Sequence, residues 1–179
     1  YRIKDILDQY DPKQIECKQW AVDEIQKHIL HRDIVVVIGG WYGLMSPMLA
    51  ESIPNLIVDY EIDAMCVELH DKLKVHENIS ILYEDGFQIF DSVEYNGEDK
   101  VIICTACEHI DGEDLYGALS MKNPKSTILL QSNNMSHIDS HVNCHESLDH
   151  FIESLPKMDI LYKGTKKFDD YERYMVIAR

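Results

Sequence analysis

Histidine and glutamate side chains that could carry acid–base chemistry follow an apolar segment in the middle of the chain. Lys100-Val-Ile-Ile-Cys104 has no polar alternation, which is typical of a strand buried on both faces, and Glu108 and His109 come shortly after it. An imidazole titrates near neutral pH and can accept a proton directly, so His109 is the first candidate for a general base. Glu108 could orient it or bind a substrate amine. His141, in a later polar segment, is the alternative base, and the spacing does not rank the two.

A second polar group follows the next apolar segment, Ser126–Leu130, which we also expect to be a strand. Ligands of open parallel sheets bind at the carboxyl ends of the strands, so side chains at these ends are candidates for substrate contact. Together with Cys107, which follows the preceding apolar segment, the set offers amides, a hydroxyl and a thiol, which suits a polar substrate: Cys107, Gln131, Ser132, Asn133 and Asn134.

Two spacings could suggest a metal. Cys104 and Cys107 form a CxxC pair, but no second CxxC exists to complete a zinc site. His137, His141 and His145 recur every four residues and would align on one face of a helix. The Ser, Asp and Asn residues between them favour a loop instead. We therefore expect no metal site.

A glycine cluster and a carboxylate mark the first part of the chain. Gly39, Gly40 and Gly43 follow an apolar segment, and Glu61 ends the next apolar segment, Leu56–Tyr60, about 20 residues later. Glycines let the backbone come close to a ligand, and a carboxylate can accept two hydrogen bonds from a ribose diol. The pattern favours a nucleoside ligand. The alternative is that the glycines only turn the chain.

Helical and strand periodicities place these residues on an α/β chain. Helices are predicted over 1–10 and 12–31, with Asp11 as N-cap of the second. Strands at 33–38, 56–60, 79–83, 100–104 and 126–130 alternate with helices at 48–52, 64–74, 87–90 and 111–121. Ser46 and Pro47 are the predicted N-cap and first residue of the helix after the glycines. A loop over 135–145, a helix over 146–155 and an antiparallel hairpin of strands 158–163 and 173–178 complete the chain.

Five β-α units followed by a helix and a terminal hairpin resemble the class I S-adenosylmethionine-dependent methyltransferase family, over roughly Asp33 to Arg179. The resemblance implies a Rossmann-like three-layer sandwich with a mostly parallel sheet and a C-terminal antiparallel hairpin. Residues 33–179 would form the S-adenosylmethionine-binding domain, and residues 1–32 a helical extension before it. The turn departs from the family's acidic-x-Gly-x-Gly-x-Gly pattern, because Val37 replaces the acid and Trp41 the middle glycine.

The resemblance also implies where the cofactor S-adenosylmethionine would bind. The turn would wrap its methionine part, Glu61 would hold the ribose, and the segment after the third strand would meet the adenine. The implied cofactor residues are Gly39, Gly40, Trp41, Tyr42, Gly43, Glu61, Ile62, Asp85, Gly86, Phe87, Cys104 and Thr105.

The leading interpretation is a methyltransferase that acts on a small polar molecule. An enzyme on the same fold that cleaves S-adenosylmethionine, or transfers its aminocarboxypropyl group, is the alternative. A third is a non-catalytic nucleotide-binding or partner module. A dinucleotide oxidoreductase fits less well, because the turn lacks Gly-x-Gly-x-x-Gly and the terminal hairpin is not expected there.

The composition limits the classes of substrate and the location that we expect for this protein. The chain has 17 basic and 32 acidic residues, a net charge of −15, which disfavours a nucleic-acid substrate. No stretch approaches the roughly 20 apolar residues of a membrane span. Five cysteines and no visible secretory signal indicate reduced thiols and a cytoplasmic location. The sequence makes no prediction of oligomeric state.

Overall fold

The computed structural model describes residues 2–31, 33–91, 100–123 and 125–179. The chain forms two compact units, Tyr1–Gly86 and Phe87–Arg179. No helix of the described residues is both long enough and apolar enough to cross a bilayer.

Two helices open the first unit: α1 (Arg2–Gln9) and α2 (Pro12–Ile25). As predicted, Asp11 caps α2, and its carboxylate accepts a hydrogen bond of 2.8 Å from the Lys13 N–H. The helix ends earlier than predicted, in the short 3-10 turn η1 (Gln26–His28). The chain then turns because the Asp33 side chain, predicted to lie in a strand, accepts a 2.6 Å hydrogen bond from the Leu30 N–H.

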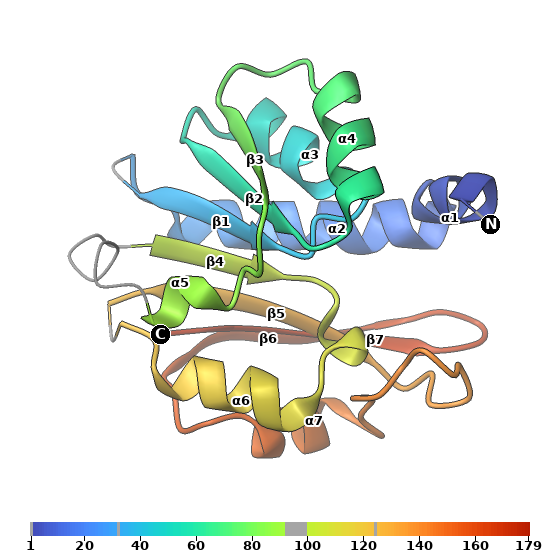
Figure 1. Ribbon diagram of the computed structural model, residues 1–179. Coiled ribbons are helices and arrows are strands. Elements are labelled where there is room, and N and C mark those ends of the chain that lie inside the picture. Colours follow the sequence, from blue (N-terminus) through green and yellow to red (C-terminus); the bar gives the residue numbers. More distant parts are fainter. Residues whose placement is uncertain (1, 32, 92–99, 124) are drawn as a thin grey trace. The chain divides into compact units, whose positions relative to one another are not determined.

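Three parallel strands form the sheet of this unit: β1 (Ile34–Ile38), β2 (Ile57–Glu61) and β3 (Ile79–Tyr83). β2 lies in the middle, with Ile57 opposite Val35 of β1 and Ile79 of β3. Helices α3 (Met45–Ser52) and α4 (Ala64–Leu73) both pack against β2 and β3 (Figure 1). This is the predicted β-α-β arrangement, with Glu61 as the last residue of its strand.

The start of α3 differs from the prediction. The helix begins at Met45, and the residue before it makes no side-chain cap. Ser46 is buried inside the first turn, and its hydroxyl donates a 2.5 Å hydrogen bond to Asp59 of β2 rather than capping the helix. A buried carboxyl group needs a partner, and Ser46 is placed to supply one. Pro47 is tolerated because first-turn N–H groups have no intrahelical acceptor.

The second unit begins with helix α5 (Gln88–Asp91) and also contains α6 (Gly112–Ser120) and α7 (Leu148–Ser154), together with the 3-10 turn η3 (Cys107–His109). Its strands are β4 (Lys100–Cys104), β5 (Thr127–Asn133), β6 (Ile160–Lys167) and β7 (Glu172–Ala178). In Figure 1, α6 and α7 are drawn on the same side of β5–β7, and α7 packs against β6 and β7. As predicted, 135–145 contains neither helix nor strand.

β4 and β5 are parallel, and β7 lies antiparallel between β5 and β6. The predicted terminal hairpin is thus confirmed. β5 runs three residues beyond its predicted end, because β7 continues the ladder as far as the pair Asn133–Arg173. Polar residues expected just after the strand are therefore part of it.

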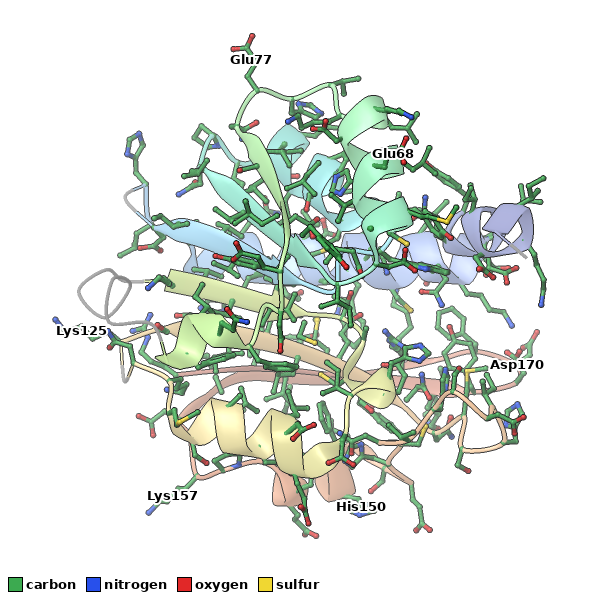
Figure 2. The ribbon with its side chains drawn as sticks, in the orientation of Figure 1. Glu68, Glu77, Lys125, His150, Lys157 and Asp170 are labelled. Atoms are coloured by element: carbon green, nitrogen blue, oxygen red, sulfur yellow. The ribbon has the colours of Figure 1, made fainter. Side chains whose placement is uncertain are left out.

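Charged side chains at the surface project away from the ribbon, as Glu77, Lys125 and Asp170 do in Figure 2. All five cysteines are free thiols. The predicted division into a helical extension, residues 1–32, and a cofactor-binding domain, residues 33–179, stays a prediction.

Candidate functional site

The glycine turn follows β1 and is folded back on β2. The Gly39 N–H donates to the Tyr60 carbonyl at 2.9 Å, and the Gly43 N–H donates to the Gly40 carbonyl at 2.9 Å. Gly39 and Gly43 have φ of 68° and 82°, which favours glycine. Trp41 has φ of 52° and is the one non-glycine residue with positive φ among those described. The residue that replaces the family's middle glycine thus adopts a conformation that strains a bulky side chain.

Glu61 holds this turn from the end of β2. Its side chain is only 7% exposed, and Oε2 accepts a hydrogen bond of 2.8 Å from the Trp41 N–H. Oε1 accepts another of 2.8 Å from the Asp63 N–H. Each carboxylate oxygen has two lone pairs, so both oxygens can still accept from a ligand hydroxyl. Hence the carboxylate is fixed in position and remains able to bind a diol.

The other predicted cofactor residues of the first unit differ in exposure. Ile62 is 70% exposed and Asp85 is exposed, while the Tyr42 side chain is buried. At Gly86 a Cβ would lie 3.0 Å from Ile38 and from Tyr60, so only a residue without a side chain fits there easily. The apolar ring of Tyr42 also forms one wall of a cavity of about 210 Å³ whose other walls come from α1 and α4.

Two buried polar side chains lie directly under the turn. A Cβ on Gly40 would lie 1.9 Å from Asp59 Oδ1, and one on Gly43 would lie 2.2 Å from His70 Cδ2. Burial raises the pKa of Asp59 to about 7 and lowers the pKa of His70 to about 4. Their nearest polar atoms are 3.6 Å apart. Below about pH 7 and above about pH 4, both groups are therefore largely neutral.

Asp59 and His70 were not singled out from the sequence. The signal for Asp59 is an acid in the middle of an apolar strand, which implies a buried partner. The signal for His70 is weaker, since a histidine in the last turn of an amphipathic helix is common on the surface. Neither position would have been connected with Gly40 or Gly43 without the fold.

In the second unit, Glu108 is the centre of a buried polar network. The residue is 4% exposed, and its Oε1 accepts hydrogen bonds from Asn133 Nδ2 at 2.8 Å and from Arg173 Nη1. Arg173 also donates through Nη2 to the Thr105 carbonyl. The other carboxylate oxygen, Oε2, is buried without a hydrogen-bond partner among the described residues. Arg173 was missed by the sequence, where its signal is a single cation at the start of an apolar strand.

The structure brings His109 and His141 together beside Glu108. The two imidazoles meet edge to face with ring centroids 4.6 Å apart. The loop that carries His141 is tied to η3, because the N–H groups of Val142 and Asn143 both donate to the Glu108 carbonyl, at 2.8 and 3.1 Å. Burial lowers the pKa of His141, which favours the neutral form of this imidazole. The three predicted catalytic residues therefore form one cluster.

The remaining predicted residues of this unit are mostly enclosed. Burial raises the pKa of the Cys107 thiol well above its usual value, which argues against a nucleophilic cysteine. Gln131, Ser132 and Asn133 are buried within β5, and their side chains bond to other parts of the protein. Asn134 is half-buried, and its Oδ1 accepts from the Glu172 N–H at 2.9 Å. Cys104 and Thr105 are buried as well, and Phe87 is half-buried.

His145 does not join the histidine cluster. Its Nδ1 lies 3.2 Å from Ser132 Oγ, and its Nε2 lies 3.2 Å from the Tyr116 hydroxyl and 3.1 Å from Ser154 Oγ. Burial lowers its pKa to about 4. The spacing of His137, His141 and His145 therefore marks no common helix face, as the loop residues between them predicted.

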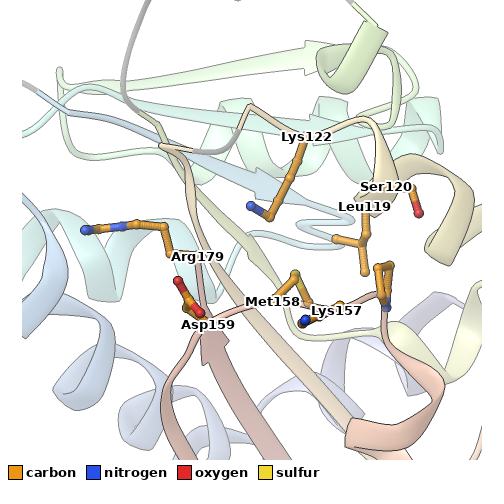
Figure 3. A pocket seen from close by; sticks show the side chains of 8 residues that line it. Leu119, Ser120, Lys122, Lys157, Met158, Asp159 and Arg179 are labelled. Carbon is orange, nitrogen blue, oxygen red and sulfur yellow. The ribbon is translucent and has the colours of Figure 1, made fainter.

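A cavity of about 510 Å³ lies elsewhere in this unit (Figure 3). Its charged lining is Lys122, Lys157, Arg179 and Asp159. Arg179 hydrogen bonds to Thr127, the first residue of β5, so the cavity lies at the opposite end of that strand from Asn133. It is not at the carboxyl edge where the sequence predicted ligand binding.

No protein-family model and no curated protein matches the sequence. Solved structures do match the fold. One is the magnesium protoporphyrin IX methyltransferase ChlM from Synechocystis PCC 6803 with bound SAM, at 13% identity and a TM-score of 0.65, covering 92% of this chain and 78% of that one. A geranyl diphosphate methyltransferase in complex with GPP and sinefungin matches at 10% identity and a TM-score of 0.68, with the same coverage. The fibrillarin/Nop5p complex matches at 19% identity and a TM-score of 0.61, covering 88% and 78%.

These likenesses extend over both units, and they agree with the parallel strands and the terminal hairpin described above. At such identities they establish the fold and leave the activity to be argued from the residues. The chain therefore has the Rossmann-like fold of the class I S-adenosylmethionine-dependent methyltransferases.

Proposed function

We propose that the protein is an S-adenosylmethionine-dependent methyltransferase that acts on a small polar molecule. The observation that carries the proposal is the link between Glu61 and the glycine turn, in which a buried carboxylate is fixed by the Trp41 N–H at 2.8 Å. On this fold, such a pair offers a diol acceptor and a close backbone approach next to each other.

The described residues fit this cofactor. In the first unit, Glu61 would hold the ribose, the turn 39–43 the methionine part, Asp85 the adenine amino group, and the exposed Ile62 the adenine ring. In the second unit, Phe87, Cys104 and Thr105 are the proposed cofactor residues. When bound, S-adenosylmethionine supplies an electrophilic methyl group on a sulfonium.

The cluster in the second unit would act on the acceptor. His109 is exposed and is the proposed base, since its Nδ1 lies 3.1 Å from the Ser140 carbonyl and its Nε2 keeps a lone pair. Glu108, buried and fixed, would orient His109 or bind an amine of the acceptor. His141 is the alternative base. Asn134 and Cys107, with the amides and hydroxyl of β5, are the proposed surroundings of the substrate.

The first test is the affinity for S-adenosylmethionine and S-adenosylhomocysteine, measured by calorimetric titration of the wild type and of Glu61→Ala. We expect the substitution to weaken binding by at least about tenfold, because it removes a charge-assisted contact to the ribose. Glu77→Ala is the matched control, since Glu77 is an exposed acid of the same unit and should leave binding unchanged. Equal affinity of wild type and Glu61→Ala would refute the nucleoside assignment.

Mass spectrometry of the same mixtures separates the two enzyme classes that this fold could serve here. Intact donor, with S-adenosylhomocysteine formed only when an acceptor is added, supports methyl transfer. Methylthioadenosine as a product would instead establish aminocarboxypropyl transfer or cleavage. No binding of either ligand would mean that Trp41 and the missing acid at Val37 have closed the usual site.

A further inference from the structure

We propose that Glu108, His109 and His141 bind a divalent transition-metal ion. Each of these three side chains offers one ligand atom, and the three atoms lie within 4.8 Å of one another. It is the one such group of His, Cys, Asp or Glu residues found in the part of the chain that the structure describes. The site would exist with or without methyl transfer, so it goes beyond the function proposed above.

The carboxylate of Glu108 is prepared for a cation. Oε1 is held by Asn133 and Arg173, and Oε2 is buried with no hydrogen-bond partner among the described residues. A buried acceptor without a partner is destabilising, whereas a metal ion at Oε2 would satisfy it. Because Asn133 and Arg173 fix the carboxylate through its other oxygen, the group has little freedom to turn away.

The hydrogen bond of His109 leaves its second nitrogen suited to a metal. A carbonyl oxygen can only accept, so the contact of 3.1 Å between Nδ1 and the Ser140 carbonyl places the proton on Nδ1. Nε2 then carries a lone pair. Metal-binding histidines commonly donate their other ring N–H to a backbone carbonyl in this way, which fixes both the tautomer and the ring orientation.

His141 is brought to the other two ligands by the backbone. Hydrogen bonds from Val142 and Asn143 to the Glu108 carbonyl hold its loop against η3. The Cys144 thiol lies 3.7 Å from His141 Nδ1 and 3.3 Å from Asn133 Oδ1. It is therefore next to the site but does not belong to the group of three ligands. The ligands thus come from η3 and from the loop after β5.

The donor set indicates the class of ion. Two imidazoles and one carboxylate suit Zn²⁺, Fe²⁺ or Co²⁺, while Mg²⁺ and Ca²⁺ prefer oxygen ligands. Metal–nitrogen bonds of about 2.0–2.1 Å bring neighbouring donors to roughly 3.3 Å apart. Small shifts of the exposed His109 and half-buried His141 side chains, with the Nδ1 contact of His109 kept, would close the remaining distance. Three protein ligands leave a position open for a water or a substrate.

A bound ion would change the roles given to the histidines above. An imidazole whose lone pair is bound to a metal cannot accept a proton, so His109 would serve as a ligand and not as a base. A metal lowers the pKa of a water or hydroxyl bound to it. Metal-loaded and metal-free protein would therefore differ in how an acceptor is activated.

The test uses the full chain after treatment with a chelator. Co²⁺ is titrated and followed by its visible spectrum, and Zn²⁺ is titrated by calorimetry, both in the absence of S-adenosylmethionine. We expect one ion per chain in the wild type and at least about tenfold weaker binding in His109→Ala and in His141→Ala. His137→Ala is the matched control, because His137 is an exposed histidine of the same loop that lies outside the cluster.

The outcomes are decisive in either direction. No saturable binding to the wild type overturns the site, and so does binding to all three variants that equals binding to the wild type. A thiolate charge-transfer band in the Co²⁺ spectrum also overturns it, because it would assign the ion to a cysteine. His109 is exposed, so its truncation should leave the fold intact, and circular dichroism of each variant verifies this. A parallel titration with S-adenosylmethionine reports separately on the proposed function.

Discussion

Asp59 and His70 support the glycine turn through the space that they occupy and the charge that they lack. Both are buried, and both lie where a Cβ on Gly40 or Gly43 would have to be. Burial disfavours the charged form of each, and so the pKa of the acid rises and the pKa of the imidazole falls. These two shifts affect stability in opposite directions as the pH changes.

The folded chain keeps the Asp59 proton up to about pH 7, whereas the unfolded chain loses it near 3.8. Stability that this proton contributes is therefore lost as the pH rises between these values. For His70 the folded chain loses the proton near pH 4 and the unfolded chain near 6.5, so stability increases over that range. Replacing Asp59 isolates its contribution to the pH dependence of the free energy of unfolding.

We expect the free energy of unfolding of Asp59→Asn, relative to that of the wild type, to be roughly 2–3 kcal/mol larger at pH 8 than at pH 5. The reason is that asparagine has the shape of the protonated acid and cannot ionise. The difference in free energy of unfolding, from urea titrations at both pH values, measures this. Asp71→Asn, at an exposed position of α4, should show no such difference. A constant difference for Asp59→Asn at the two pH values would contradict the buried neutral acid.

At the scale of elements, the turn after β1 has no room for a side chain at Gly43, whereas α6 has room for one at Gly117. We expect Gly43→Ala to lower the free energy of unfolding by more than about 2 kcal/mol, because φ is 82° and the methyl group would meet the His70 ring. Gly117→Ala in α6 is the matched control, since Gly117 is exposed and nothing lies within 4 Å of its added Cβ. It should instead gain up to about 1 kcal/mol. Thermal unfolding of both variants gives the comparison, and a stable Gly43→Ala would refute the packing.

Elements were predictable from the sequence where local pattern decides them. β3 and β4 have the predicted bounds, and Asp11 caps α2, because apolar runs and caps depend on neighbouring residues. Ends set by distant contacts were not predictable. β5 is extended by pairing with β7, and Ser46 bonds to Asp59 instead of capping α3.

The candidate site shows the same limit. The sequence nominated Glu108, His109 and His141 by residue type, and the structure brings them together. The sequence alone could not rank His109 and His141 as bases. It also could not connect Glu108 with Arg173, which lies 65 residues later in the chain. The predicted polar end of β5 became a buried hydrogen-bonded segment for the same reason, since its partners come from distant parts of the chain.

At the scale of the whole molecule, the net charge says more about the class of substrate than the fold does. Solved structures with this fold include proteins named for unlike substrates, so the fold does not choose one. The net charge of −15 does discriminate, because nucleic-acid affinity depends largely on cations that neutralise phosphates.

We therefore expect no retardation of a short RNA or DNA duplex in a gel-shift titration, with a dissociation constant weaker than about 100 µM at about 0.15 M salt. A basic RNA-binding protein of similar size serves as the positive control. Submicromolar binding that weakens steeply with salt would reveal a local basic surface and overturn the expectation of a small-molecule substrate.

The position of β7 between β5 and β6 has a consequence for biosynthesis. Of the strands of the second unit, β7 is the last to leave the ribosome, yet it forms the ladders with both of its neighbours. Arg173, which holds Glu108, arrives with it. A nascent chain arrested before Glu172 should therefore expose β5 and β6 unpaired and be cut readily by protease, while the first unit can already fold. Emergence of β7 from the ribosome would therefore complete the Glu108 cluster.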